Sequence, residues 1–259
     1  MKRALMTGAG HRLGAAMALF LADRGFDVAV HYASSSAGAE DVAKAIAAKG
    51  QKSVALRADL LDDEETSQLF ASAKDALGGP ITCLINNASI FEYDTVTSAT
   101  RESWDRHMGS NLRAPFVLTQ EMAAQDLSAV PDANGEPMAA ALILNMIDQR
   151  VRKLTPEFMT YTLAKMGLWA MTQTTARALA PAIRVNAIGP GPTLQGARQS
   201  AEHFAQQRAN TALERGANPS DITAALGYFL DAPAVTGQLL CVDGGQHLSW
   251  QTPDVLGVE

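Results

Sequence analysis

Apolar runs of strand length alternate with amphipathic stretches along the whole chain, and this alternation limits the fold more than any other feature. The seven runs are RALM, FDVAVHY, KSVALRADL, ITCLINNAS, AALILNMI, IRVNAIGPG and GQLLCVDGG. The apolar residues of ITCLINNAS are consecutive at its centre and do not alternate with polar ones, which is typical of parallel strands covered on both faces. Strands separated by helices with right-handed crossovers predict a doubly wound α/β fold with a seven-stranded parallel sheet flanked by helices.

Helical periodicity fills the intervals between these runs. Apolar residues from Leu13 to Leu21 recur at helical spacing after the first run. Further helices are predicted over 37–50, 62–79, 101–126, 157–180, 197–214 and 219–231, and PDANGEP at 131–137 is expected to be a surface excursion. Because no linker or repeat interrupts the pattern, residues 1–259 are expected to form a single domain.

Composition excludes several classes of function. With 47% hydrophobic and 19% charged residues the chain can bury a large core, and a formal charge of -6 argues against a nucleic-acid partner. No run of 18 apolar residues appears and the chain enters a strand pattern at once, so we expect a cytoplasmic protein with no membrane partner. Cys83 and Cys241 stand in apolar runs, which indicates buried thiols and no metal site.

The segment MTGAGHRLGAAM places three glycines, Gly8, Gly10 and Gly14, between the first strand and the first helix. The spacing is one residue longer than G-x-G-x-x-G, and Leu13 stands where that fingerprint has its last glycine. The free N–H groups and the dipole of a helix N-terminus attract anions. In an α/β chain, the turn after the first strand is where dinucleotides bind. This loop therefore predicts a site for a nucleotide pyrophosphate.

The end of the second strand, VHYASSS, bears on which dinucleotide is bound. NAD sites carry an acid here that holds the ribose 2′-hydroxyl, whereas this chain has none before Glu40. His11, Arg12, Ser34 and Ser35 offer the donors and positive charge that a 2′-phosphate needs. NADP is therefore favoured over NAD, although the same residues also fit an ordinary serine-rich turn.

YTLAK places Tyr161 and Lys165 four residues apart, on one face of a predicted helix. An ammonium beside a phenol stabilises the phenolate, so we expect Lys165 to lower the pKa of Tyr161 toward that of a working general acid. By itself this spacing also fits a solvated helix face.

Together these motifs resemble the short-chain dehydrogenase/reductase family over essentially the whole chain. The shared segments are TGAGHRLG at 7–14, ADL at 58–60, NNAS at 86–89, SNLRAPF with Asn111, YTLAK, RVNAIGPG at 184–191 and GQLLCVDGG at 237–245. The resemblance implies a Rossmann domain that transfers hydride with NAD(P), in a homotetramer. It implies that Tyr161 donates a proton, that Lys165 is its partner and a ribose ligand, and that Asn111 supports a proton relay.

The resemblance also implies cofactor ligands in the turns that follow the strands. Asp59 is implied near the adenine, and Pro190 and Gly191 near the nicotinamide. The full cofactor set comprises Gly8, His11, Arg12, Leu13, Gly14, His31, Tyr32, Ala33, Ser34, Ser35, Asp59, Leu60, Asn87, Ala88, Ser89, Asn111, Tyr161, Lys165, Pro190 and Gly191.

One departure from the family pattern concerns the substrate. Most members carry serine about 13 residues before the tyrosine, and here Asp148 stands at that position. An ionised carboxylate only accepts hydrogen bonds, so it would repel the oxygen of a ketone as that oxygen gains negative charge. Asp148 suits a substrate that offers N–H groups or takes up a proton on nitrogen. The alternatives are a catalytically impaired relative and a solvent-facing aspartate.

Arg12, VHY, NNASIF, NMID and YTLAK together resemble the pteridine reductases within this family. In that subgroup an aromatic residue at the position of Phe91 covers the pterin. The implied substrate-binding set is Arg12, Phe91, Asp148, Tyr161 and Pro192, and the polar segment 193–215 is expected to form a lid. The subgroup tends to have lysine at the position of His11 and arginine at that of Ser34.

The leading hypothesis is an NADPH-dependent reductase of a dihydropterin-type imine. A reductase of a carbonyl substrate, such as a 3-oxoacyl thioester or ketone, is the second. A non-catalytic protein that binds NADP as a sensor is the third.

Overall fold

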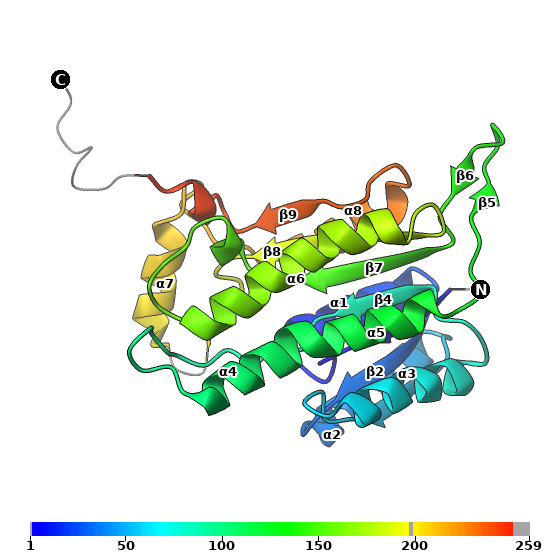
Figure 1. Cartoon of the computed structure of the whole chain (residues 1–259), viewed down its shortest axis with the longest axis horizontal. Coiled ribbons are helices and arrows are strands. Elements are labelled where there is room, and N and C mark those ends of the chain that lie inside the picture. Colours follow the sequence, from blue (N-terminus) through cyan, green and yellow to red (C-terminus); the bar gives the residue numbers. More distant parts are fainter. Residues whose placement is uncertain (1, 197–198, 251–259) are drawn as a thin grey trace.

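The computed structural model describes residues 2–196 and 199–250. Seven parallel strands form one sheet in the order β3-β2-β1-β4-β7-β8-β9, with helices on both faces (Figure 1). This confirms the predicted doubly wound α/β fold. The strands are β1 (Arg3–Met6), β2 (Asp27–Tyr32), β3 (Ser53–Arg57), β4 (Cys83–Asn86), β7 (Ala141–Met146), β8 (Ile183–Pro190) and β9 (Leu239–Val242).

Each face of the sheet has its own apolar layer. On one face α1 (Arg12–Asp23), α2 (Ser36–Ala48) and α8 (Pro219–Asp231) pack around Met17, Val30 and Phe229. On the other, α3 (Asp63–Leu77), α5 (Ala114–Ala123) and α6 (Met159–Ala178) pack around Leu5, Phe70 and Leu118. Strands buried on both sides explain why the apolar runs are continuous.

The ends of α3 follow directly from its sequence. The Asp62 carboxylate accepts hydrogen bonds from the backbone N–H groups of Glu64 and Glu65, which would otherwise lack partners. Gly78 ends the helix in the left-handed conformation, with φ 81°, which glycine adopts at little cost.

The prediction of one continuous helix over 101–126 is wrong, because the helix is interrupted. α4 (Arg101–Met108) is followed by one π-helical turn, Gly109–Arg113, before α5 begins. Pro115 has no N–H to offer the carbonyl of Asn111 four residues earlier, so the α-helical hydrogen-bond ladder cannot continue at this point. The wider turn holds the side chain of Asn111 fully buried.

Two other predicted segments have different bounds. The excursion at 131–137 lies in a hairpin of β5 (Val130–Pro131) and β6 (Pro137–Met138), whose turn is held by the Asp132 carboxylate. Of the helix predicted over 197–214, α7 (Ala201–Ala209) is present, and residues 197–198 lie outside the described residues. A helix without a buried residue has no apolar packing to extend it.

The two thiols are free; Cys83 is buried and Cys241 is half-buried. Among the described residues no group of histidine, cysteine and acidic side chains is arranged to hold a metal ion. Within the same residues, no helix combines the length and apolar character needed to cross a membrane.

Candidate active site

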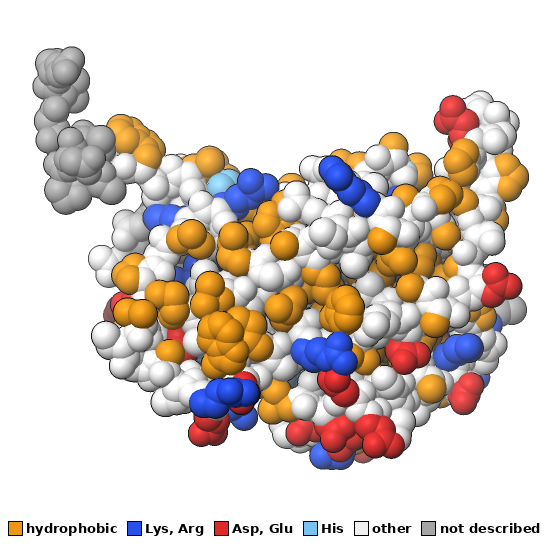
Figure 2. Space-filling view, viewed as in Figure 1, with side chains coloured by type: hydrophobic (Ala, Val, Ile, Leu, Met, Phe, Trp, Pro, Cys, Tyr) orange, Lys and Arg blue, Asp and Glu red, His pale blue; other side chains and the backbone are white. Residues whose placement is uncertain are grey.

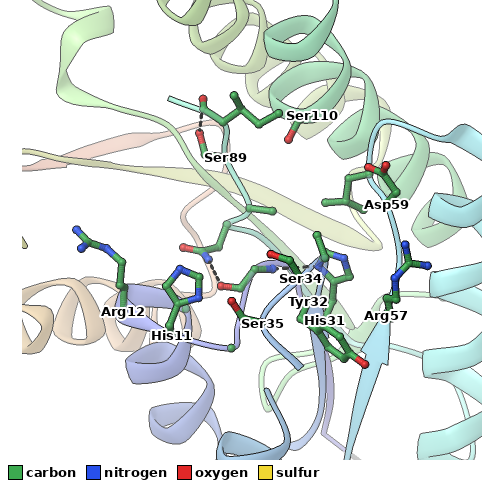
Figure 3. A pocket seen from close by; sticks show the side chains of 18 of the residues that line it. His11, Arg12, His31, Tyr32, Ser34, Ser35, Arg57, Asp59, Ser89 and Ser110 are labelled. Atoms are coloured by element: carbon green, nitrogen blue, oxygen red, sulfur yellow. Dashed lines mark hydrogen bonds between the residues drawn. The ribbon is translucent and has the colours of Figure 1, made fainter. Parts of the chain in front are cut away.

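A pocket of about 550 Å³ lies at the carboxyl ends of the strands, where the strand order reverses between β1 and β4 (Figure 3). It is lined by the turns after β1, β2, β3 and β4. The predicted cofactor residues that line it are Gly8, His11, Arg12, Leu13, Gly14, His31, Tyr32, Ala33, Ser34, Ser35, Asp59, Leu60, Asn87, Ala88 and Ser89.

The glycine loop of this pocket has no room for side chains. Gly8 has φ +62°, and a Cβ on Gly14 would lie 2.2 Å from the Gly8 carbonyl oxygen. The Asn87 amide donates to the carbonyls of Thr7 and Gly8, at 2.9 and 3.0 Å. The loop therefore presents backbone close to the cavity at the N-terminus of α1, as an anion site requires.

His31 supports this loop from within the protein. Its Nδ1 accepts a hydrogen bond from the Gly8 N–H at 3.1 Å, so the ring proton lies on Nε2, which donates to the Ala58 carbonyl at 3.1 Å. Only 1% of the residue is exposed, and burial lowers its pKa. His31 is thus neutral and joins the turns that follow β1 and β3.

We expect the free energy of unfolding to fall as pH decreases below about 6.5, because the unfolded chain then binds a proton that buried His31 resists. His31→Gln can still donate toward Ala58 but does not titrate, so its stability should change less over the same interval. His107, whose pKa burial also lowers, keeps part of the dependence in both proteins. Urea unfolding at a series of pH values measures this. Equal slopes for the variant and the wild type would contradict the assignment.

Arg12 connects the first pocket to a second one. Its backbone has φ 55°, and its guanidinium donates to the carbonyls of Leu194 and Gln195 at 3.0 and 2.9 Å. The second pocket has a volume of about 980 Å³, and Arg12 and Leu13 line both. Phe91, Asp148, Pro190, Gly191 and Pro192 also line the second pocket.

The segment expected to form a lid borders this second pocket. Its lining residues there are Thr193, Leu194, Gly196, Gln199, His203, Phe204 and Gln207. Within this segment the Arg208 guanidinium donates to the Pro192 carbonyl at 2.8 Å, and the Leu213 N–H donates to the Gly244 carbonyl at 2.9 Å.

Asp148 lines the second pocket, and the predicted catalytic residue Tyr161, which is 5% exposed, lies behind it and is not among the lining residues of either pocket. The Tyr161 hydroxyl donates to Asp148 Oδ2 at 2.9 Å, and Asp148 Oδ1 accepts from the Arg150 N–H at 2.8 Å. Burial raises the pKa of the Asp148 carboxyl, and it raises the pKa of Tyr161 well above its usual value, with the nearby Asp148 charge acting in the same direction. The expectation that Lys165 lowers the Tyr161 pKa is therefore wrong, because burial and Asp148 prevail.

Lys165 is buried with 2% of its surface exposed. Its Nζ donates to the Met146 carbonyl at 2.8 Å and lies 5.7 Å from the centre of the Tyr161 ring. Burial lowers the pKa of Lys165 to about 8.

Asn111 is buried but has no hydrogen bond to Lys165. Its Oδ1 accepts from the Ile90 N–H and its Nδ2 donates to the Ile90 carbonyl, both at 2.8 Å. The π-helical turn thereby fixes the backbone next to Phe91. A role for Asn111 in a proton relay stays a prediction.

Phe91 belongs to an aromatic cluster. Its ring stacks on Phe158 with centroids 4.3 Å apart and meets the Tyr161 ring edge-on at 4.7 Å. The Arg150 guanidinium lies 4.9 Å from the centre of the Phe158 ring. The sequence reading missed Phe158 and Arg150. Phe158 lies three residues before Tyr161 and Arg150 lies two residues after Asp148. This closeness in the sequence to predicted site residues was the signal that could have identified them.

Comparison with models of known protein families shows the family of the chain. The family model described as enoyl-(acyl carrier protein) reductase matches residues 8–247. The chain belongs to the short-chain dehydrogenase/reductase family.

Several known members are similar along their full length. FolM alternative dihydrofolate reductase 1 from Brucella suis, solved in complex with NADP, is 40% identical, with a TM-score of 0.88 and 98% of each chain covered. A short-chain dehydrogenase from Burkholderia cenocepacia in complex with NADP is 28% identical, with a TM-score of 0.84 and coverage of 95% and 97%. The 3-oxoacyl-[acyl-carrier-protein] reductase FabG of Staphylococcus aureus is 30% identical over 95% of this chain and 98% of its own.

Proposed function

We propose that this short-chain dehydrogenase/reductase is an NADPH-dependent reductase of a dihydropterin-type substrate. The observation that carries the proposal is the Asp148 carboxyl, hydrogen-bonded to the Tyr161 hydroxyl at 2.9 Å. A carboxyl here accepts N–H groups of an aminopyrimidinone ring and repels a ketone oxygen that gains charge. The likeness to the FolM protein supports the same substrate class.

The first pocket fits NADP. The crowded glycine loop at the N-terminus of α1 suits a pyrophosphate, while Ser34 and Ser35 line the pocket where a ribose is held in such folds. Relatives solved with NADP support this cofactor. When bound, it supplies the hydride. Pro190 and Gly191, which line the second pocket, would lie beside its nicotinamide.

The side chains of Tyr161, Asp148 and Lys165 would protonate the substrate. A phenol is already neutral at pH 7, and burial and Asp148 raise the pKa of Tyr161 further, so it holds a proton that it can donate. Asp148 accepts the hydrogen bond of the Tyr161 hydroxyl and orients it, and because burial raises the pKa of Asp148, this carboxyl can take up a proton and return it to Tyr161 after the phenol has donated its own. Lys165, fixed on the Met146 carbonyl, lies beside the Tyr161 ring and stabilises negative charge that develops there.

Phe91 and the residues around it provide a surface for a flat ring. The Phe91 side chain is 44% exposed and lines the second pocket together with Arg12 and Asp148. Stacking an aromatic ring contributes about 1 kcal/mol beyond the area that it buries.

A substrate panel tests the proposal. Purified protein with NADPH should reduce dihydropterins, followed by loss of NADPH absorbance, with a kcat/KM at least about tenfold above that for ketones. The likeness to FabG favours reduction of a 3-oxoacyl thioester as the second candidate. A preference for 3-oxoacyl thioesters or ketones would establish that candidate in its place. Binding of NADPH without turnover on either group would instead indicate a sensor.

We further infer that the chain assembles as a homotetramer. Hydrophobic side chains gather on the face over α4, α5 and α6 (Figure 2). These helices carry the exposed residues Trp104, Phe116 and Leu163, which are 44%, 39% and 42% exposed. An apolar surface of this kind is typical of an interface. The cytoplasmic location stays a prediction.

A further inference from the structure

The first pocket has little free positive charge where the ribose of a dinucleotide is held. Ser34 and Ser35, in the turn after β2, supply hydroxyls only. The Arg12 guanidinium donates to the Leu194 and Gln195 carbonyls. Arg106 also lines the pocket, and it is bound to the Glu92 carboxylate at 2.8 and 3.3 Å. His11 and Arg12 were the residues predicted from the sequence to supply positive charge to a 2′-phosphate. Of the two only Arg12 is permanently charged, and its guanidinium is already bound to backbone carbonyls.

Arg57 occupies the right place to supply that charge. It is the last residue of β3 and pairs with Tyr32, two residues before Ser34 in the neighbouring strand. It lines the first pocket with Ser34 and Ser35, and Figure 3 shows it on the side of the pocket next to Asp59. Its side chain is 61% exposed, and Glu65 is 3.5 Å from its guanidinium, a longer distance than in a strong charged hydrogen bond.

We propose that Arg57 is the specificity residue for NADP, binding the 2′-phosphate of the adenosine together with the hydroxyls of Ser34 and Ser35. A guanidinium forms two parallel hydrogen bonds to phosphate oxygens and stays charged at every physiological pH. In this chain the basic group thus comes from the end of β3. Pteridine reductases tend to carry it at the position of Ser34, after the neighbouring strand β2. The inference rests on the NADP preference proposed above.

Calorimetric binding of two adenosine fragments tests this without turnover. We expect Arg57→Gln to weaken binding of 2′,5′-ADP at least about tenfold, since the variant loses the charge-assisted hydrogen bonds to the phosphate. Binding of 5′-AMP, which lacks the 2′-phosphate, should change less than about twofold. Lys44→Gln on α2 removes the same charge from a side chain that is 74% exposed, and it should leave both affinities unchanged.

The outcomes separate the two proposals. A wild-type protein that prefers 2′,5′-ADP, with an Arg57→Gln variant that keeps the preference, would overturn the role of Arg57 alone. Equal losses for both fragments would also overturn it, because they would indicate a contact with the adenine or a loss of the fold. A wild-type protein without preference for 2′,5′-ADP would overturn both Arg57 as a phosphate ligand and the choice of NADP.

Discussion

Tyr161→Phe is expected to lower kcat for the pterin by about 10²–10⁴-fold while NADPH still binds, because the variant loses only the proton donor. The ring of Tyr161 is 5% exposed and meets Phe91 edge-on, and phenylalanine keeps both the volume and that contact. Single-turnover kinetics with NADPH, followed by absorbance, measure the chemical step, and cofactor titration measures binding.

Tyr228→Phe provides the matched control, since this tyrosine is 52% exposed on α8, far from Asp148 in the sequence. It should leave kcat unchanged. A loss of less than about tenfold in Tyr161→Phe would mean that another group delivers the proton, and the assignment of Tyr161 would be wrong.

Asp148→Ser is expected to lower pterin turnover by about 100-fold or more, because a neutral hydroxyl has no acidic proton for Tyr161 and accepts the N–H groups of a pterin without the charge of a carboxylate. Turnover of simple ketones should rise in the same variant, since serine donates a hydrogen bond to a carbonyl oxygen. The ratio of kcat/KM for the two substrate classes is the quantity to measure.

Two further variants sharpen this result. Asp148→Asn keeps the shape and an oxygen acceptor but has no carboxyl proton, so a loss similar to that of Asp148→Ser would point to the charge and the proton. Asp41→Ser alters an aspartate of α2 whose side chain is 78% exposed, and it should have no effect. Near-normal pterin kinetics in Asp148→Ser would refute the role of Asp148 and weaken the case for a pterin.

The sequence predicted the sheet because its signals are local and repeated. Each strand is a short apolar run, and a glycine such as Gly78 ends a helix in the one conformation that favours it. The turns that follow β1, β2, β3 and β4 line one pocket because the carboxyl ends of parallel strands share one edge.

The parts that the sequence did not predict depend on contacts between distant residues. The hydrogen bond by which Asn111 holds the backbone of Ile90, 21 positions earlier, is one such contact. The raised pKa of Tyr161 requires its depth of burial, which spacing from Lys165 does not give. Arg57 precedes the ADL segment and gives no sign in the sequence that it shares a pocket with Ser34.

Arg12 joins the two pockets, and this bears on how a ligand in one affects binding in the other. Its backbone is part of the glycine loop and its guanidinium holds two carbonyls of the segment that borders the second pocket. If a ligand in one pocket favours the arrangement in which these two bonds form, and a ligand in the other pocket needs the same arrangement, the two affinities are linked. Thermodynamic reciprocity makes that linkage equal in both directions. One side chain would thus turn two adjacent cavities into a coupled pair.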